Sequence, residues 1–156
     1  MSEMADIRCE GADTVDAIMP VMDSAFDPIF GEAWTAAQCF GMLTIPGTDL
    51  LVARYKGAIV GFALLRSLLD ETELLLIAIH KDHQRKGLGK QLARAVIEHA
   101  KNRGAKMVFL EVREGNTALS LYLHVGFVQV GKRESYYRGK AGEYFNALTL
   151  RYEITP

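Results

Sequence analysis

The sequence predicts a mixed α/β fold in which helices cover both faces of one central sheet. Three observations support this prediction. Strand-like apolar segments alternate with helical patterns, one strand-like segment is apolar throughout, and a long amphipathic segment follows it. We expect the order β-α-α-β-β-β-α-β-α-β-β. The length of 156 residues is typical of one domain, so residues 1–156 are expected to form a single unit.

The first part of the chain predicts one short strand and two helices. Residues 7–9 form the expected strand. Apolar residues at helical spacing predict a helix over 14–25, which Asp13 can cap and which Pro20 should kink or divide. A Thr-Ala-Ala-Gln capping box then predicts a second, short helix over 36–43.

The middle of the chain predicts three strands. Segments 50–55 and 58–67 flank a Lys56-Gly57 turn and form an expected β-hairpin, in which Gly61 should mark a bulge. Segment 74–80 is so apolar that both faces of this strand are expected to be buried.

The last part of the chain predicts two helices and three strands. An amphipathic helix is expected over 87–103, with charged residues along one face. A strand over 106–113 and a short helix over 117–124 follow. Two closing strands over 127–136 and 144–154 complete the predicted sheet.

Composition limits the classes of function. Hydrophobic residues make up 49% and charged residues 24%, as in folded globular chains. The 18 basic and 19 acidic residues leave a net charge of −1, so no direct nucleic-acid binding is expected. The longest apolar run is far shorter than the ~20 residues that cross a bilayer, and the N-terminus lacks a signal-peptide pattern. We therefore expect a cytoplasmic protein with no membrane partner.

The cysteines and histidines show no pattern of a metal site. Cys9 and Cys39 form no CxxC pair and are expected to be reduced thiols. No metal is expected, because metal-ligand spacing to Asp, Glu or Cys is missing at the four histidines, His80, His83, His99 and His124.

A glycine-rich turn follows the apolar strand and opens the amphipathic helix. A helix N-terminus presents unpaired N–H groups and a partial positive charge. The glycines Gly87 and Gly89 let the backbone approach a phosphate closely, and Arg85, Lys86 and Lys90 add positive charge at the same place. This combination suits a pyrophosphate better than a lone carboxylate.

Two common phosphate motifs do not fit this turn. The GxxxxGK[ST] pattern of P-loop proteins is missing, and Leu92 stands where a GxGxxG motif has its third glycine. A surface turn that only caps the helix is the remaining alternative. The strand, the glycines, the basic residues and the amphipathic helix occur in one register, which disfavours that alternative.

The turn Gln84-Arg85-Lys86-Gly87-Leu88-Gly89 resembles the acyl-CoA pyrophosphate loop of the GNAT superfamily of N-acetyltransferases. The resemblance continues through Leu110–Arg113, Asn116 and the Ala-x-x-Leu-Tyr-x-x-x-Gly-Phe pattern of 118–127. It implies a mostly antiparallel central sheet. Within the superfamily, the sequence is most similar to the bacterial ribosomal-protein alanine N-acetyltransferases, on the residues Leu76–Ile79, the loop, Leu110–Arg113, Tyr136-Tyr137 and Gly142-Glu143.

The resemblance implies acetyl-CoA as co-substrate, no metal, and two catalytic residues. Glu111 takes the position of the general base and Tyr122 that of the general acid. The resemblance also implies a set of cofactor-binding residues, namely Ile77, Ala78, Ile79, Gln84, Arg85, Lys86, Gly87, Leu88, Gly89, Lys90 and Asn116. Asn116 is one residue closer to the following alanine than is usual in the family.

Each catalytic candidate has a structural alternative. Glu111 could pair with Arg113, which lies on the same face of the predicted strand. Tyr122 could be an aromatic side chain packed under the sheet. Asp27, Glu32 and Trp34 are candidates for an acceptor groove, together with the segment 138–143.

The expected function is acetyl transfer to an amine, with the N-terminal α-amine of a protein such as a ribosomal protein as the leading acceptor. A small amine, a polyamine or an amino acid is the alternative acceptor, and a non-catalytic acyl-CoA-binding module is the alternative of another class. The expected oligomeric state is a monomer or a homodimer.

Overall fold

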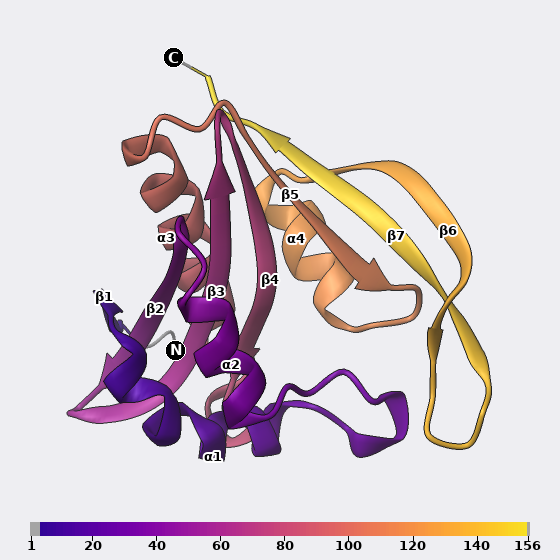
Figure 1. Cartoon of the computed structure of the whole chain (residues 1–156), viewed down its shortest axis with the longest axis horizontal. Coiled ribbons are helices and arrows are strands. Elements are labelled where there is room, and N and C mark those ends of the chain that lie inside the picture. Colours follow the sequence, from indigo (N-terminus) through magenta and orange to yellow (C-terminus); the bar gives the residue numbers. More distant parts are fainter. Residues whose placement is uncertain (1–3, 156) are drawn as a thin grey trace.

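In the part of the chain that the structure describes, a seven-stranded sheet forms the centre (Figure 1). The computed structural model describes residues 4–155. The expectation about the N-terminus rests partly on residues 1–3, which lie outside the described residues, as does residue 156. The strands are β1 (Asp6–Glu10), β2 (Thr48–Tyr55), β3 (Ala58–Leu68), β4 (Glu71–Ile79), β5 (Met107–Arg113), β6 (Val128–Arg138) and β7 (Tyr144–Glu153).

Within residues 4–155, four helices accompany the sheet: α1 (Val15–Ala25), α2 (Ala36–Leu43), α3 (Leu88–Asn102) and α4 (Ala118–Val125). Short 3₁₀ turns precede α1, α2 and α3, at Ala12–Thr14, Pro28–Phe30 and Lys81–His83. The predicted order of strands and helices is confirmed. In the described part of the chain, no helix is long and apolar enough to span a bilayer.

Strand pairing follows the order β1-β2-β3-β4-β5-β7-β6. All neighbours are antiparallel except β4 and β5, which are parallel. The expected mostly antiparallel sheet is therefore confirmed. The predicted bulge in β3 is also present, because Ala53 pairs with Gly61 while Arg54 pairs with Ile59.

Helices pack on both faces of the sheet, as predicted. One face carries α1 and α2, whose apolar side chains contact Leu50 and Val52 of β2. The other face carries α3 and α4, and there Leu51 joins the core instead. Neighbouring residues of one strand thus enter opposite cores, because side chains alternate across a strand. This arrangement explains why the central strands are apolar at consecutive positions.

The parallel strands β4 and β5 separate after a short paired stretch. Their pairing runs from Glu71 with Met107 to Glu73 with Phe109, and ends there. A register shift in the β3–β4 pair lies just beyond this point, between Leu64 and Leu65 of β3. Figure 1 shows the two strands diverging toward their carboxyl ends. The divergence leaves one edge of each strand unpaired in the middle of the sheet.

Two expectations about α1 are wrong. Asp13 does not cap the helix, because the chain enters α1 through the 3₁₀ turn and Thr14 occupies the N-cap position. Pro20 does not divide the helix, which runs without interruption from Val15 to Ala25. Pro20 lies on the exposed side of α1, where its missing N–H leaves no buried acceptor unpaired.

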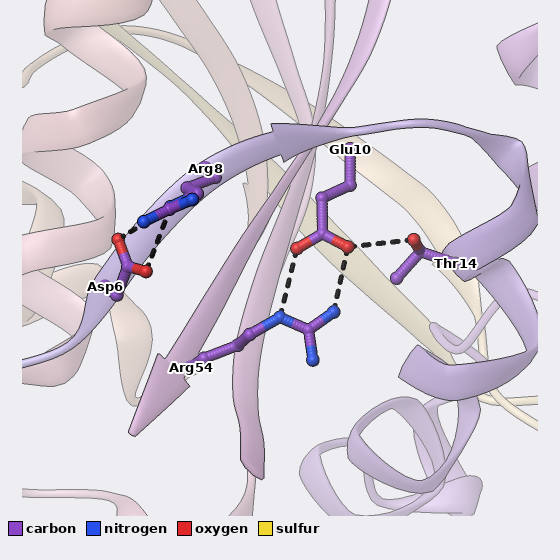
Figure 2. A network of polar contacts seen from close by, with 5 residues as sticks. All are labelled: Asp6, Arg8, Glu10, Thr14 and Arg54. Carbon is purple, nitrogen blue, oxygen red and sulfur yellow. Dashed lines mark hydrogen bonds and ion pairs between the residues drawn. The ribbon is translucent and has the colours of Figure 1, made fainter. Parts of the chain in front are cut away.

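A polar network fastens the edge strand β1 to its neighbours (Figure 2). The Glu10 carboxylate accepts hydrogen bonds from Arg54 of β2, at 2.8 Å from Nη2, and from the Thr14 hydroxyl, at 2.9 Å. The Arg54 contact is the main reason that the pKa of Glu10 lies below its ordinary value. The network thus joins β1, β2 and the start of α1.

Candidate functional site

The separated strands open into a cleft of about 1340 Å³. Its walls come from the ends of β4 and β5, the turn before α3, the helix α4, and the segment between α1 and α2. All but two of the predicted site residues line this cleft: Ile77, Ala78, Ile79, Gln84, Arg85, Gly87, Gly89, Lys90, Glu111, Asn116 and Tyr122. Residues that are far apart in the sequence therefore meet at one place.

The cleft also corrects one expectation about β4. Segment 74–80 was expected to be buried on both faces, but Leu75, Leu76 and Ile77 are only half-buried. These residues line the cleft that the divergence of β4 from β5 creates. Their apolar character therefore provides an apolar wall rather than a sealed core.

The turn before α3 has the backbone conformation expected of an anion-binding loop. Arg85 and Gly87 both adopt left-handed conformations, with φ of 64° and 85°. Such conformations turn successive N–H groups toward one side, where they can form a concave site for an anion. The Gln84 amide fixes the turn to the strand, because its Nε2 donates a hydrogen bond to the Ile79 carbonyl at 2.9 Å.

The two predicted residues outside the cleft lining are Lys86 and Leu88. The Leu88 side chain is 1% exposed and packs in a small core with Ala53 and Val60. Only the backbone of Leu88 can therefore contribute to the turn, and its side chain anchors the start of α3. The Lys86 side chain does not belong to the cleft wall.

Gly89 allows α3 and α4 to approach closely. A Cβ atom at this position would lie 3.0 Å from Cδ2 of Leu121 in α4. Contacts of that length are tight for real side chains, so the Leu121 side chain would have to shift to accommodate a larger residue at this position. The glycine therefore shapes the cleft, which both helices line.

Glu111 lies on β5 with a side chain that is 19% exposed, and Arg133 of β6 reaches it across the sheet. The Arg133 Nη2 atom lies 3.2 Å from Oε1 of Glu111, and the Arg133 side chain is 57% exposed. The alternative that Glu111 pairs with Arg113 is wrong. Sequence reasoning missed the true partner, because β6 lies two strands away in the sheet.

Arg113 instead forms a nearly buried ion pair with Glu32. Its Nε atom lies 3.3 Å from Oε1 of Glu32, and the two side chains are 9% and 14% exposed. The guanidinium carbon also lies 3.5 Å from the ring centre of Phe30 and 5.7 Å from that of Phe145. Arg113 thereby fixes the segment between α1 and α2 against the sheet at the mouth of the cleft.

Tyr122 lines the cleft from α4 and is 6% exposed. Its ring packs edge-on against Phe127, with centres 5.8 Å apart. Burial is the main cause that raises the pKa of the phenol far above its ordinary value, with Glu32 and Tyr137 adding to the effect. The hydroxyl therefore stays protonated, so packing and proton donation are compatible in this residue.

The acceptor-groove candidates Asp27, Glu32 and Trp34 line the cleft, whereas the segment 138–143 does not. Tyr137 of β6 joins them, and burial together with the charges of Glu111 and Glu32 raises its pKa to about 12. In the sequence, Tyr137 contributes only to the family resemblance and is not a predicted site residue. No local pattern could assign it to the site, because its place there depends on the pairing of β6 with β7.

Asn116 has a local role at the start of α4. Its Oδ1 atom accepts a hydrogen bond from the Ala118 N–H at 2.8 Å, and its carbonyl accepts one from Leu119 at 3.1 Å. The short spacing between Asn116 and Ala118 therefore serves to begin the helix. Asn116 also lines the cleft, beside the carboxyl end of β5.

A second group of chemically active side chains lies away from the cleft. Cys9, Asp49 and His99 come from three elements, and their possible ligand atoms lie within 4.8 Å of one another. The carboxylate already has partners, since Oδ2 of Asp49 lies 2.8 Å from Nε2 of His99 and 3.4 Å from Nη1 of Arg103. Sequence spacing alone failed to reveal this cluster.

Comparisons with known proteins identify relatives of this chain. Residues 16–127 match the acetyltransferase (GNAT) family. Over 92 residues the chain is 40% identical to the ribosomal protein bS18-alanine N-acetyltransferase of Haemophilus influenzae, and the match covers 59% of this chain and 63% of that enzyme. Over 125 residues it is 38% identical to the N-alpha-acetyltransferase RimI of Mycobacterium tuberculosis, which covers 77% of this chain and 75% of that protein.

The fold also matches a solved structure. The ribosomal-protein-S18-alanine N-acetyltransferase from Escherichia coli superposes with a TM-score of 0.87 at 26% identity. The superposition covers 98% of this chain and 96% of that one. The similarity therefore extends to β6 and β7, which lie beyond the residues that match the family.

Proposed function

The chain belongs to the acetyltransferase (GNAT) family, and on that premise we propose that it transfers the acetyl group of acetyl-CoA to the N-terminal α-amine of a ribosomal protein. One observation carries the proposal: a left-handed, glycine-containing turn at the N-terminus of α3 shares a cleft with Glu111 and Tyr122. A ribosomal acceptor also implies that the reaction occurs in the cytoplasm.

The turn before α3 fits the pyrophosphate of acetyl-CoA. Backbone N–H groups at a helix N-terminus favour anions, and the side chains of Arg85 and Lys90 line the same part of the cleft. A side chain at Gly87 would crowd the ligand and strain the backbone, whose φ is 85°. The unpaired edge of β4 at Ile77–Ile79 offers backbone groups to an extended ligand arm, as in strand addition.

Glu111 and Tyr122 can move the two protons that the reaction requires. Acetyl-CoA supplies the acetyl group as a thioester. Glu111 takes a proton from the attacking amine, whose nitrogen forms the new bond to the carbonyl carbon. Tyr122 gives its proton to the sulfur as the carbon–sulfur bond breaks, and its raised pKa keeps that proton available until then. Arg133 must release Glu111 first, and its exposed side chain is free to turn into solvent.

An α-amine is easier to deprotonate than a lysine side chain. The ordinary pKa values are about 7.7–8.0 and about 10.4, so at pH 7 the lysine costs roughly 3.4 kcal/mol more. A single carboxylate base can therefore deprotonate an α-amine more readily than a lysine side chain. The names of the two sequence relatives specify an alanine or an α-amine as acceptor. The acidic residue Asp27 at the cleft favours a cationic N-terminal segment.

Small amines, polyamines and free amino acids are the competing acceptors. A non-catalytic acyl-CoA-binding module is less well supported, because such a module needs neither Glu111 nor Tyr122 in the cleft.

Mass spectrometry can decide between these acceptors. The purified chain and acetyl-CoA are incubated with two synthetic peptides that begin with alanine and contain one lysine, one with a free and one with a blocked N-terminus. We expect acetylation of the free peptide only, at the α-amine. Equal acetylation of the blocked peptide, or faster acetylation of spermidine or free alanine, would refute the proposed acceptor.

A further inference from the structure

The strand β6 is interrupted where it passes the cleft. Arg133 pairs with Ala147 and Tyr137 pairs with Phe145, so the three residues 134–136 lie opposite the single residue Asn146. In the middle of this bulge, Ser135 adopts a left-handed conformation with φ of 54°. Residues other than glycine rarely adopt that conformation without support from their surroundings.

Asn146 supplies that support with both ends of its side-chain amide. Its Oδ1 atom accepts a hydrogen bond from the Ser135 N–H at 2.9 Å. Its Nδ2 atom donates to Oε1 of Glu114 at 3.1 Å. Glu114 is itself fixed, because its N–H donates to the Asn146 carbonyl at 2.8 Å and its Oε2 lies 3.3 Å from Nζ of Lys132. Contacts with Asn146 and Lys132 hold the pKa of Glu114 below its ordinary value.

The Asn146 side chain and the Tyr137 side of the cleft lie on opposite faces of the sheet. Phe145 contacts Arg113 and Phe30 on the cleft side, and side chains alternate along β7. Asn146 therefore points to the other face, on which Leu148 and Leu150 join the core with α3. Asn146 is absent from the cleft lining.

The residues at the two ends of the bulge face the cleft side. Arg133 reaches Glu111, and Tyr137 lines the cleft. In a regular strand, the three intervening residues would face three partners, whereas here they face only one. The shape of the bulge therefore determines where Arg133 and Tyr137 stand relative to Glu111.

We propose that Asn146 is a positioning residue for the amine acceptor: it holds the β6 bulge in the shape that places Tyr137 in the cleft wall and Arg133 beside Glu111. This inference rests on the proposed function. It requires no contact between Asn146 and either substrate. Loss of the Asn146 amide should therefore weaken use of the acceptor while binding of acetyl-CoA, on the far side of the cleft, stays the same.

The main test is Asn146→Ala in the full chain, with a synthetic peptide that begins with alanine as acceptor. We expect the KM for the peptide to rise about tenfold, the size expected when hydrogen bonds that hold a binding surface are lost. The Kd for acetyl-CoA, from calorimetry, should stay within about twofold. Hydrogen exchange followed by mass spectrometry should become faster at residues 133–137 in the variant.

Exchange of the amide at position 146 with the carboxylate at position 114 tests whether the hydrogen-bond network can be restored. In the double variant Asn146→Asp with Glu114→Gln, the carboxylate at position 146 still accepts the hydrogen bond from the Ser135 N–H. It also accepts a hydrogen bond from the side-chain amide at position 114. We expect both the peptide KM and the exchange at 133–137 to return close to wild-type values. Asn146→Asp alone retains the acceptor for Ser135 but sets two carboxylates side by side, so it should show a smaller rise in KM. If Asn146→Ala does not fold, the single variant Asn146→Asp takes its place in the main test.

Arg54→Met is the matched control for general destabilisation. It breaks a polar network of similar extent at the opposite edge of the sheet. We expect it to lower the melting temperature with no change in the peptide KM. An unchanged KM in Asn146→Ala, an unchanged exchange at 133–137, or a failed rescue would overturn the inference while wild-type activity stands. A wild-type chain that acetylates no α-amine would overturn the proposed function and this inference together.

Discussion

Replacement of Arg113 by methionine tests the best-defined electrostatic feature of the cleft. The ion pair with Glu32 is nearly buried, with side-chain exposures of 9% and 14%. Methionine fills much of the same volume and keeps contact with the rings of Phe30 and Phe145. The substitution therefore removes the charge while disturbing the packing little, and it leaves the Glu32 carboxylate without its partner.

Removal of one partner from a buried pair costs about 3–5 kcal/mol, because the other charge stays desolvated. Glu32 retains some contact with solvent through the cleft, which reduces the expected loss to about 2–3 kcal/mol. For a chain of this length, such a loss lowers Tm by roughly 5–10 °C. In Arg113→Met with Glu32→Gln, no unpaired charge remains, so more than half of the lost stability should return.

Urea unfolding followed by circular dichroism measures these differences. Arg151→Met is the matched control, because its pair with Glu153 is far more exposed, at 44% and 70%. This control should lose less than about 0.5 kcal/mol. The reasoning fails if Arg113→Met matches the control, or if the double variant is no more stable than the single one.

Three further predictions concern the chemistry and the pH dependence. Tyr122→Phe should lower kcat by about 10²–10⁴-fold with an unchanged Kd for acetyl-CoA, and an equal kcat would show that the hydroxyl does not donate the proton. Gly87→Asp should abolish acetyl-CoA binding in calorimetry, because it strains the left-handed turn and sets a carboxylate beside the phosphates. The pKa of Glu10 lies below 4.5 in the folded state, so its contribution to stability is present above that pH and is lost as the pH falls further. The stability difference between wild type and Arg54→Met should therefore shrink on acidification, and a constant difference would contradict the role of Glu10.

Patterns that depend on near neighbours in the sequence predicted most of the fold. The capping box at Thr35 and Gln38 is present in the structure, and the amphipathic segment forms α3. The turn before α3 could be predicted for the same reason, since its strand, glycines and helix are consecutive. The two wrong predictions, at Asp13 and Pro20, also concern local patterns. Asp13 lies in a 3₁₀ turn before the helix, and Pro20 lies within the helix with its ring exposed.

The Tyr137 side of the cleft could not be predicted in this way. Glu111 and Arg133 are 22 residues apart and meet only because β7 pairs between their strands. Tyr137 enters the site only because β6 carries extra residues against β7. The pairing of β7 with β5 and with β6 cannot be predicted from hydrophobic periodicity, because β6 is exposed along most of its length and lacks an apolar pattern.

The two halves of the cleft therefore differ in how they are built. The side with the turn before α3 is made from one continuous segment, in which Gln84 binds the end of β4 and Leu88 anchors the helix. The side with Tyr137 depends on contacts between separate strands, and on the Asn146 amide at the bulge. A change in β6 or β7 can thus alter the acceptor surface without touching the turn. This separation allows one side of the cleft to change in sequence while the other stays the same.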